Sequence, residues 1–421
     1  MLRKFLTHKR TRNACHIYTM LTNAARKKHL SFHTPGHKIG QWDLTELSFS
    51  DNLACPDGCI AKAQQDAADI LSASACFFLT DGSTSGVFSM LYASKLLGVK
   101  TLVVPANAHK SVDNACAVFG LGTQRFSEVE QIPGMLEQAD ALLITSPNYY
   151  GNIPDLQALH TLCKAKNKLF LIDGAHGGHL HFDSALYAGT YADIWVDGVH
   201  KSLPAFTQAA LVCAKTEETA NALQSAVNVF RTTSPSYPIL ASIEYAVKYP
   251  RNEWLEAQVR AFANTQPRVQ LHEDWTKLCV HIGKDAFAAQ KHLENLGIYP
   301  EFCDGENIVF YLSPALKKSA FFALKTKLLQ VFEKYPEVKT QHIPAPVFSQ
   351  INGETEWVEL AESEGRICAE NCGLFPPCTP LILRGQKVDK TRVALLQNAP
   401  AVYGLQDKKI CVYKQDDKVK I

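Results

Sequence analysis

The stretch Val196-Asp197-Gly198-Val199-His200-Lys201-Ser202-Leu203-Pro204 decides how this sequence is interpreted. The apolar segment ADIWV at 192–196 leads into it, and a proline ends it. Lys201 therefore stands just beyond a predicted strand, next to a histidine. A lysine that leaves its ammonium state can form an imine with an aldehyde. Taken alone, the segment fits a solvated turn at least as well, so the upstream segments have to separate these two interpretations.

Short apolar segments alternate with helix-like segments between residue 60 and residue 215. The predicted strands are KTLVVP at 100–105, ALLITS at 141–146, KLFLID at 168–173, ADIWV at 192–196 and AALVCA at 209–214. Helices are predicted at 15–28, 61–72, 111–120 and 155–166. Buried strands separated by helices predict an α/β fold with a mainly parallel sheet that helices cover on both faces.

The pattern of predicted helices and strands changes after Pro250. A long helix is predicted at 252–265, and it is followed by strand, helix and strand at 277–282, 284–296 and 307–312. We therefore expect an N-terminal segment at 1–40, a large domain at 41–250 and a smaller α+β domain at 251–421. The proline clusters at 344–346 and 375–380 are expected to lie near the end of the smaller domain.

Composition argues against several classes of protein. The chain has 421 residues, 46% of them hydrophobic, and a net charge of +2, so no basic excess indicates a nucleic-acid partner. No apolar run approaches the length of a membrane span, and the polar, basic N-terminus lacks a secretory signal pattern. The 13 scattered cysteines fit reduced thiols better than a disulfide framework. We expect a cytoplasmic protein.

The segment Asp81-Gly82-Ser83-Thr84-Ser85-Gly86 precedes an apolar helix. Glycines permit a close backbone approach, and hydroxyl groups and helix amides hold anions at the positive end of a helix. Ser83, Thr84 and Ser85 are therefore candidate phosphate ligands. An ordinary helix cap is the alternative.

Asp173 ends the strand KLFLI and is followed by Gly174, Ala175 and His176. Ligands gather at the carboxyl ends of strands in an open α/β sheet. An aspartate there fits the pyridinium nitrogen of pyridoxal phosphate, and a flat ring fits against Ala175. With the lysine, this predicts pyridoxal phosphate as the cofactor. A turn aspartate is the alternative.

Other histidines and tyrosines are less specific. His109 follows a strand and is suited to stack on a flat cofactor, with a capping histidine about equally probable. Tyr150 either lines the site or packs its loop. His176, His179 and His181 lack metal-binding spacing and an obvious carboxylate ligand, so no metal is expected.

Taken in order, these segments resemble the Orn/Lys/Arg decarboxylase family of fold-type I (aspartate aminotransferase-like) pyridoxal-phosphate enzymes, in its short form without an N-terminal wing domain. The resemblance covers about residues 30–390. Its stretches are HTPGHK at 33–38, DGSTSG at 81–86, NAHKSV at 107–112, PNYYG at 147–151, DGAHGGH at 173–179, HKSLPAFTQ at 200–208 and TTSPSY at 232–237. Weaker matches are DWTKL at 274–278, GRICAE at 365–370 and FPPCTPLI at 375–382.

The resemblance implies roles for individual residues. Lys201 would form the Schiff base, Asp173 would pair with the ring nitrogen, and His109 would stack on the ring. The residues expected around the rest of the cofactor are Ser83, Thr84, Ser85, Ala175, His176 and His200, together with Thr232 and Ser234 from across the interface of a homodimer or an assembly of dimers.

The sequence departs from the family pattern at several flanking positions. Gly174 replaces a usual glutamate, Ala106 a frequent arginine, and the Asp197-Gly198 neighbourhood a usual serine or threonine. The C-terminal motif is also altered, at Pro376-Pro377-Cys378 and Arg384-Gly385-Gln386. These changes leave cofactor binding expected and make the substrate and full activity less secure.

The leading hypothesis is decarboxylation of lysine, ornithine or arginine to a diamine or polyamine and carbon dioxide. Glu370 is a weak candidate for the distal cation of the substrate, and His37 and Tyr150 are weaker candidates for substrate contacts. Two alternatives stay open. One is an aminotransferase or lyase on the same fold. The other is a regulatory relative without activity.

Overall fold

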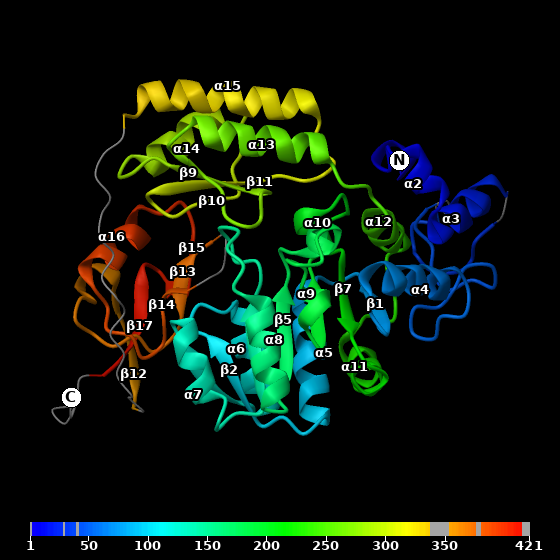
Figure 1. Ribbon diagram of the computed structural model, residues 1–421, viewed down its shortest axis with the longest axis horizontal. Coiled ribbons are helices and arrows are strands. Elements are labelled where there is room, and N and C mark those ends of the chain that lie inside the picture. Colours follow the sequence, from blue (N-terminus) through cyan, green and yellow to red (C-terminus); the bar gives the residue numbers. More distant parts are fainter. Residues whose placement is uncertain (1, 28–29, 39–41, 337–352, 376–379, 415–421) are drawn as a thin grey trace.

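The computed structural model describes residues 2–27, 30–38, 42–336, 353–375 and 380–414. A seven-stranded sheet lies at its centre, in the order β1-β7-β6-β5-β4-β2-β3 (Figure 1). The strands are β1 (Ala75–Leu79), β2 (Thr101–Pro105), β3 (Gly122–Phe126), β4 (Ala141–Thr145), β5 (Leu169–Gly174), β6 (Ile194–Asp197) and β7 (Ala210–Ala214).

The predicted α/β fold with a mainly parallel sheet is confirmed. Strands β3, β2, β4, β5 and β6 run parallel, whereas β7 is antiparallel to both β6 and β1. The short connection at 198–209 explains this reversal, because a parallel return needs a longer crossover than an antiparallel one. Two strands escaped the sequence analysis, namely β1 and the polar edge strand β3.

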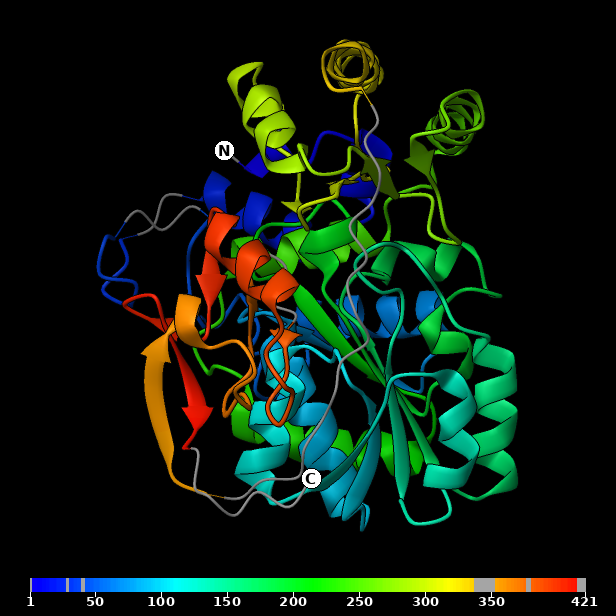
Figure 2. The same ribbon diagram turned by 90° about the vertical axis from the view of Figure 1, so that its left-hand side faces the viewer.

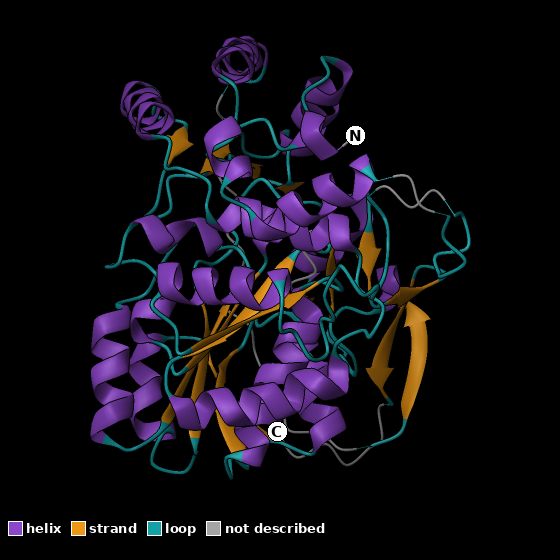
Figure 3. Ribbon diagram, turned by 90° about the vertical axis from the view of Figure 1, so that its right-hand side faces the viewer, coloured by secondary structure: helices purple, strands orange, loops and turns teal. Residues whose placement is uncertain are grey.

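Helices cover both faces of this sheet (Figure 3). One face packs mainly on α3, α4, α8 and α12, and the other on α5, α6 and α11. The helices of this part are α1 (Leu2–Phe5), α2 (Lys9–Asn13), α3 (His16–Arg26), α4 (Cys59–Leu71), α5 (Ser83–Leu96), α6 (Lys110–Phe119), α7 (Ile132–Met135), α8 (Leu156–Ala165), α9 (Ala188–Tyr191), α10 (Val199–Ser202), α11 (Glu217–Phe230) and α12 (Tyr237–Val247), with 3-10 turns at Val129–Gln131 and Gly178–Phe182.

The chain after Pro250 builds two smaller units with separate cores. The first is a four-stranded antiparallel sheet, covered by the long helices at the top of Figure 1. It comprises α13 (Glu253–Thr265), β8 (Val269–Gln270), β9 (Lys277–His281), α14 (Ala286–Asn295), β10 (Phe302–Cys303), β11 (Asn307–Tyr311) and α15 (Lys318–Lys334).

The second unit holds two three-stranded sheets and one helix, and Figure 2 shows its long strands at the side of the molecule. It comprises β12 (Thr355–Glu359), a 3-10 turn at Leu360–Glu362, β13 (Cys372–Leu374), β14 (Pro380–Ile382), α16 (Lys390–Asn398), β15 (Val402–Tyr403), β16 (Leu405–Gln406) and β17 (Lys409–Tyr413). The proline cluster at 344–346 and residues 376–379 of the FPPCTPLI match lie outside the described residues. The predicted domain boundaries stay a prediction.

None of the helices that the structure describes is both long enough and apolar enough to cross a lipid bilayer.

Candidate active site

Lys201 lies in the short helix α10, directly after strand β6 and Gly198. Its Nζ atom is 3.2 Å from Nε2 of His176, which belongs to the loop after β5. The two loops meet because β5 and β6 are adjacent parallel strands, with Asp173 opposite Val196. A single crossover thus separates Asp173 from Lys201, and both residues stand at the carboxyl edge of the sheet.

Asp173 is buried at the end of β5, with 3% of its surface exposed. Its Oδ1 accepts a hydrogen bond from the backbone N–H of Ala175 at 3.1 Å. This bond turns the chain sharply after the strand and keeps the small Ala175 beside the carboxylate.

Gly174 and Gly198 allow the two strand ends to approach each other. A Cβ atom on Gly174 would lie 2.9 Å from Oδ1 of Asp197, and one on Gly198 would lie 2.5 Å from the carbonyl oxygen of Ala175. No side chain fits at either position without movement of the backbone. The departure at Gly174 from the usual glutamate therefore has a steric reason in this chain.

His109 caps the N-terminus of α6, where its Nδ1 accepts a hydrogen bond from the backbone N–H of Ser111 at 3.2 Å. Burial lowers the pKa of His109, and the charge of Lys201 lowers it further, whereas Asp173 opposes both effects. Charges act this way only over short distances. The structure thus brings His109, Asp173 and Lys201 together, and it favours a neutral imidazole.

His176 is buried between the large sheet unit and the first of the two smaller units. Its ring contacts Tyr149 and Tyr311, with ring centroids 4.7 Å and 5.3 Å away. Burial lowers the pKa of His176 well below its usual value, and the charges of Lys201 and Lys277 lower it further. Its Nδ1 has no hydrogen-bond partner within the described part of the chain. His176 is therefore a neutral base with a nitrogen facing Lys201.

The candidate phosphate cradle lies at the start of α5. Gly82 occupies the N-cap position with a φ of 89°, and no side chain caps the helix. The hydroxyl of Ser85 donates to Oδ1 of Asp81 at 2.7 Å, whereas Thr84 is exposed and Ser83 half-buried. The free amides of the first helical turn are thus left for an anion.

The other residues predicted at the cofactor occupy varied surroundings. His200 is held by a 2.9 Å hydrogen bond between its Nδ1 and the carbonyl oxygen of Ala209, and burial lowers its pKa although this bond opposes the shift. Thr232 accepts a 3.1 Å hydrogen bond from the backbone N–H of Ser234, which is exposed. An exposed segment of this kind is compatible with contact to a second subunit.

The three substrate candidates lie in different surroundings. His37 is exposed and pairs with Asp43 at 3.0 Å. Tyr150 donates to Oδ2 of Asp304 at 2.7 Å, so its hydroxyl is directed toward the smaller unit. Glu370 is exposed on the second C-terminal unit. It is Tyr149, the neighbour of Tyr150, that contacts His176.

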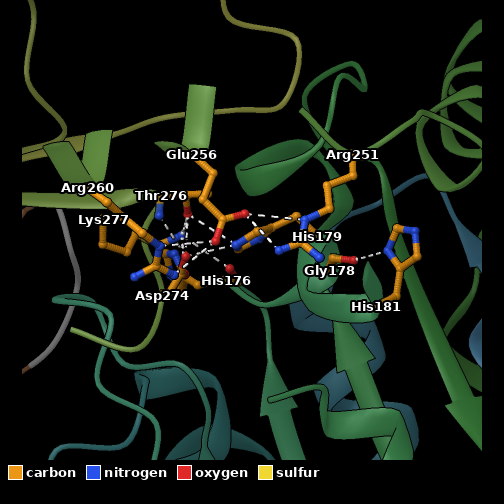
Figure 4. A network of polar contacts seen from close by, with 10 residues as sticks. All are labelled: His176, Gly178, His179, His181, Arg251, Glu256, Arg260, Asp274, Thr276 and Lys277. Atoms are coloured by element: carbon orange, nitrogen blue, oxygen red, sulfur yellow. Dashed lines mark hydrogen bonds and ion pairs between the residues drawn. The ribbon is translucent and has the colours of Figure 1, made fainter. Parts of the chain in front are cut away.

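A buried polar network that the sequence analysis did not assign lies beneath His176 (Figure 4). Asp274 binds Nε2 of His179 at 2.8 Å and Nζ of Lys277 at 3.0 Å. Lys277 is fully buried and also donates to Thr276 at 3.0 Å and to the carbonyl oxygen of His176 at 3.3 Å. The only sequence signal was the weak match DWTKL at 274–278, which suggested no role.

Charge pairing makes this network stable. Burial alone would raise the pKa of Asp274, but His179 and Lys277 outweigh it and hold the pKa far below its usual value. His179 belongs to the large sheet unit, whereas Asp274 and Lys277 lead into β9 of the smaller unit. The network therefore joins the two units directly behind His176 and Lys201. The three histidines considered as metal ligands have separate partners, since His181 binds the carbonyl oxygen of Gly178 at 2.7 Å.

Glu301 is a second residue that sequence reasoning missed. Glu301 directly precedes β10, and part of its side chain is open to solvent. Partial burial raises its pKa, whereas the charges of Lys201 and Lys277 oppose that shift. The positive charges of Lys201 and Lys277 thus act on the Glu301 carboxylate, which is open to solvent.

The residues present fit pyridoxal phosphate. An uncapped helix end suits the phosphate, a buried carboxylate suits the ring nitrogen, and a lysine beside a neutral histidine suits the aldehyde. A small residue, Ala175, lies between them.

Comparisons with known proteins agree with this chemistry. Residues 127–270 match the family model described as "Orn/Lys/Arg decarboxylase, major domain". The chain is 27% identical to "Uncharacterized protein YaaO" of Bacillus subtilis (strain 168), over 96% of this chain and 99% of that protein. It is 26% identical to "Arginine decarboxylase" of the same organism, over 90% of this chain and 92% of the relative.

A solved structure shares the fold. The constitutive lysine decarboxylase of E. coli superposes with a TM-score of 0.70 at 18% identity, over 94% of this chain and 82% of that chain. The predicted fold-type I architecture is thereby confirmed, and the match over residues 127–270 agrees with the predicted family. Family and fold together indicate a decarboxylase of basic amino acids.

Proposed function

We propose that this chain is an Orn/Lys/Arg decarboxylase, which removes the α-carboxylate of lysine, ornithine or arginine with pyridoxal phosphate bound at Lys201. The products are carbon dioxide and the corresponding diamine or agmatine-type amine. The observation that carries this proposal is the 3.2 Å contact between Nζ of Lys201 and Nε2 of His176, at the edge of the sheet where Asp173 is buried.

Pyridoxal phosphate, when bound, supplies an electron sink for the carbon–carbon bond that breaks. Asp173 would face the ring nitrogen and hold its proton, because a buried carboxylate stabilises a neighbouring positive charge. Ser83, Thr84, Ser85 and His200 would hold the phosphate, with Thr232 and Ser234 reaching it from a second subunit. His109 would stack on the ring, and Ala175 would leave room for it.

Proton movements fall to Lys201 and His176. A lysine must lose its proton before it reacts with an aldehyde, and His176 Nε2 is within hydrogen-bonding distance to accept or return that proton. The lowered pKa of His176 keeps the ring neutral near pH 7, so that its Nε2 can accept a hydrogen bond from Lys201. Lys201 is also the group we propose to return a proton to the α-carbon after carbon dioxide leaves.

The distal cation of the substrate needs an acidic partner. We infer that Glu301 is a better candidate than Glu370, because the charges of Lys201 and Lys277 act on Glu301. Glu370 is exposed on the other C-terminal unit and has no described contact with these lysines.

The test is a direct assay of the purified chain with added pyridoxal phosphate. We expect the visible absorbance band of the cofactor joined to a lysine, and release of carbon dioxide from at least one of L-lysine, L-ornithine and L-arginine. The Lys201→Ala variant should show neither. A cofactor band with an amino-group transfer product and no carbon dioxide would support an aminotransferase instead. A chain that shows no band would favour the regulatory alternative.

A further inference from the structure

Arg231 is a buried cation without a partner. It follows the last residue of α11 and is 7% exposed. Within the part of the chain that the structure describes, its guanidinium makes no hydrogen bond and no ion pair, and its Nη1 is completely enclosed. A guanidinium is always charged in proteins, and burying it unpaired is costly. The position therefore calls for an anion.

The segment that carries Arg231 packs on α5. Phe230, the preceding residue, packs on Phe88 and Tyr92 of α5, with ring centroids 5.9 Å and 5.6 Å away. Helices α11 and α5 pack closely along their lengths. Arg231 thus follows directly after a residue that contacts the second and third turns of α5.

Asp81 does not satisfy this cation. Burial lowers the pKa of Arg231, and the charge of Asp81 opposes that shift. They form no ion pair, and Oδ1 of Asp81 is occupied by the hydroxyl of Ser85 at 2.7 Å. The same loop leaves the N-terminus of α5 without a side-chain cap. Arg231 is thus a buried cation without a partner among the described residues, at the end of a helix that packs on α5, and the N-terminal amides of α5 are uncapped.

We propose that Arg231 is a phosphate-binding residue, which holds the phosphate group of the cofactor together with the amides at the N-terminus of α5. This inference rests on the proposed function, since it takes pyridoxal phosphate as the ligand. No known motif identified Arg231, which stands just before the stretch TTSPSY at 232–237. The guanidinium supplies a forked pair of donors that suits a phosphate.

The experiment compares pyridoxal phosphate with pyridoxal, which has the same aldehyde and ring but no phosphate. Cofactor-free full-length protein is titrated with each, followed by tryptophan fluorescence and absorbance. For the Arg231→Met variant we expect the Kd for pyridoxal phosphate to rise roughly tenfold or more, while the Kd for pyridoxal changes less than about twofold. Inorganic phosphate should raise the Tm of the cofactor-free wild type and not that of the variant.

Controls separate binding from folding. Arg12 is equally buried, at 8% exposure, and its Nη1 donates to the carbonyl oxygen of Leu6 at 2.8 Å. The Arg12→Met variant should lose stability but keep the preference for pyridoxal phosphate over pyridoxal. If Arg231→Met does not fold, Arg231→Lys and Arg231→Gln replace it, with lysine expected to retain more of the preference.

Two results would overturn the inference. One is an unchanged preference for pyridoxal phosphate over pyridoxal in the Arg231 variants. The other is dissociation of an oligomer in these variants with the preference intact, which would assign the guanidinium to a subunit contact. If the wild type binds neither pyridoxal phosphate nor pyridoxal but is still stabilised by phosphate through Arg231, the proposed function fails and the anion site stands.

Discussion

Glu301 illustrates how a single carboxylate is expected to select the substrate. If it meets the distal cation, Glu301→Gln should raise the KM for the preferred basic amino acid by roughly tenfold or more, because a charge-assisted contact is lost. The kcat should change much less, since Glu301 is far along the substrate from the bond that breaks. Steady-state kinetics of Glu301→Gln and Glu370→Gln decide between the two carboxylates. A rise in KM only for the Glu370 variant would contradict our assignment.

The single carboxyl group of Asp197 is expected to make the free energy of unfolding depend on pH. It is buried beside Asp173, and burial raises its pKa to about 7 from 3.8, although a 2.8 Å hydrogen bond from the Tyr187 hydroxyl opposes the shift. The folded chain therefore holds more protons than the unfolded chain between about pH 4 and pH 7, and stability falls as the pH rises through this window.

The Asp197→Asn variant should remove this contribution, which is on the order of 2–4 kcal/mol. Urea unfolding at pH 5 and pH 8 measures this contribution. The free energy of unfolding should fall less between pH 5 and pH 8 in the Asp197→Asn variant than in the wild type. Glu130→Gln, which removes an exposed carboxyl group, is the control and should leave the difference unchanged. Equal pH dependence in the wild type and the Asp197 variant would refute the assignment.

At the scale of elements, the contact between the loop after β5 and the start of β9 depends on Lys277 and Asp274. Lys277→Met leaves a fully buried carboxylate with one partner fewer, which we expect to cost roughly 3–5 kcal/mol of unfolding free energy. Lys291→Met breaks an exposed pair with Glu294 at 3.7 Å and should cost less than about 1 kcal/mol. Denaturant unfolding of both variants tests this, and similar costs would contradict the argument.

Strands could be predicted from the sequence where burial on both faces alone determined the pattern of residues. The strands β2, β4, β5 and β6 appear within about two residues of their predicted positions, because strands buried on both faces read as continuous apolar runs. The edge strand β3 (GTQRF) lacks such a run, since one of its edges and part of its surface face solvent. The direction of β7 depends on pairing between distant segments, which no local pattern contains.

The site was predictable to a similar degree. Lys201, Asp173 and His109 were singled out from strand ends and from the family resemblance, and the structure brings them together. Their roles stay predictions. Lys277 and Glu301 escaped because they lie far from Lys201 in the sequence, where isolated charges look like ordinary surface residues. Arg231 escaped because it stands just before the stretch TTSPSY and not within it.

At the scale of the whole molecule, we expect a homodimer. Leu30 and Phe32 are 89% and 92% exposed, which is unusual for two large apolar side chains so close in sequence, and a second copy of the chain would cover them. Sedimentation equilibrium should give twice the chain mass of 46.6 kDa. Phe32→Ser should weaken the dimer, whereas Tyr299→Ser, at a 78% exposed position on the smaller unit, should not. A monomeric wild type at micromolar concentration would rule out this dimer.

The pairing of His179 with Asp274 also has a consequence for synthesis on the ribosome. A nascent chain that has emerged as far as residue 250 contains every strand of the large sheet and Lys201, but neither Asp274 nor Lys277. His176 and His179 then lack the groups that bury and fix them, and the site stays open on that side. We therefore expect that competence to bind the proposed cofactor is acquired late, when the smaller unit has followed, and that incomplete chains carry Lys201 without the residues proposed to act with it.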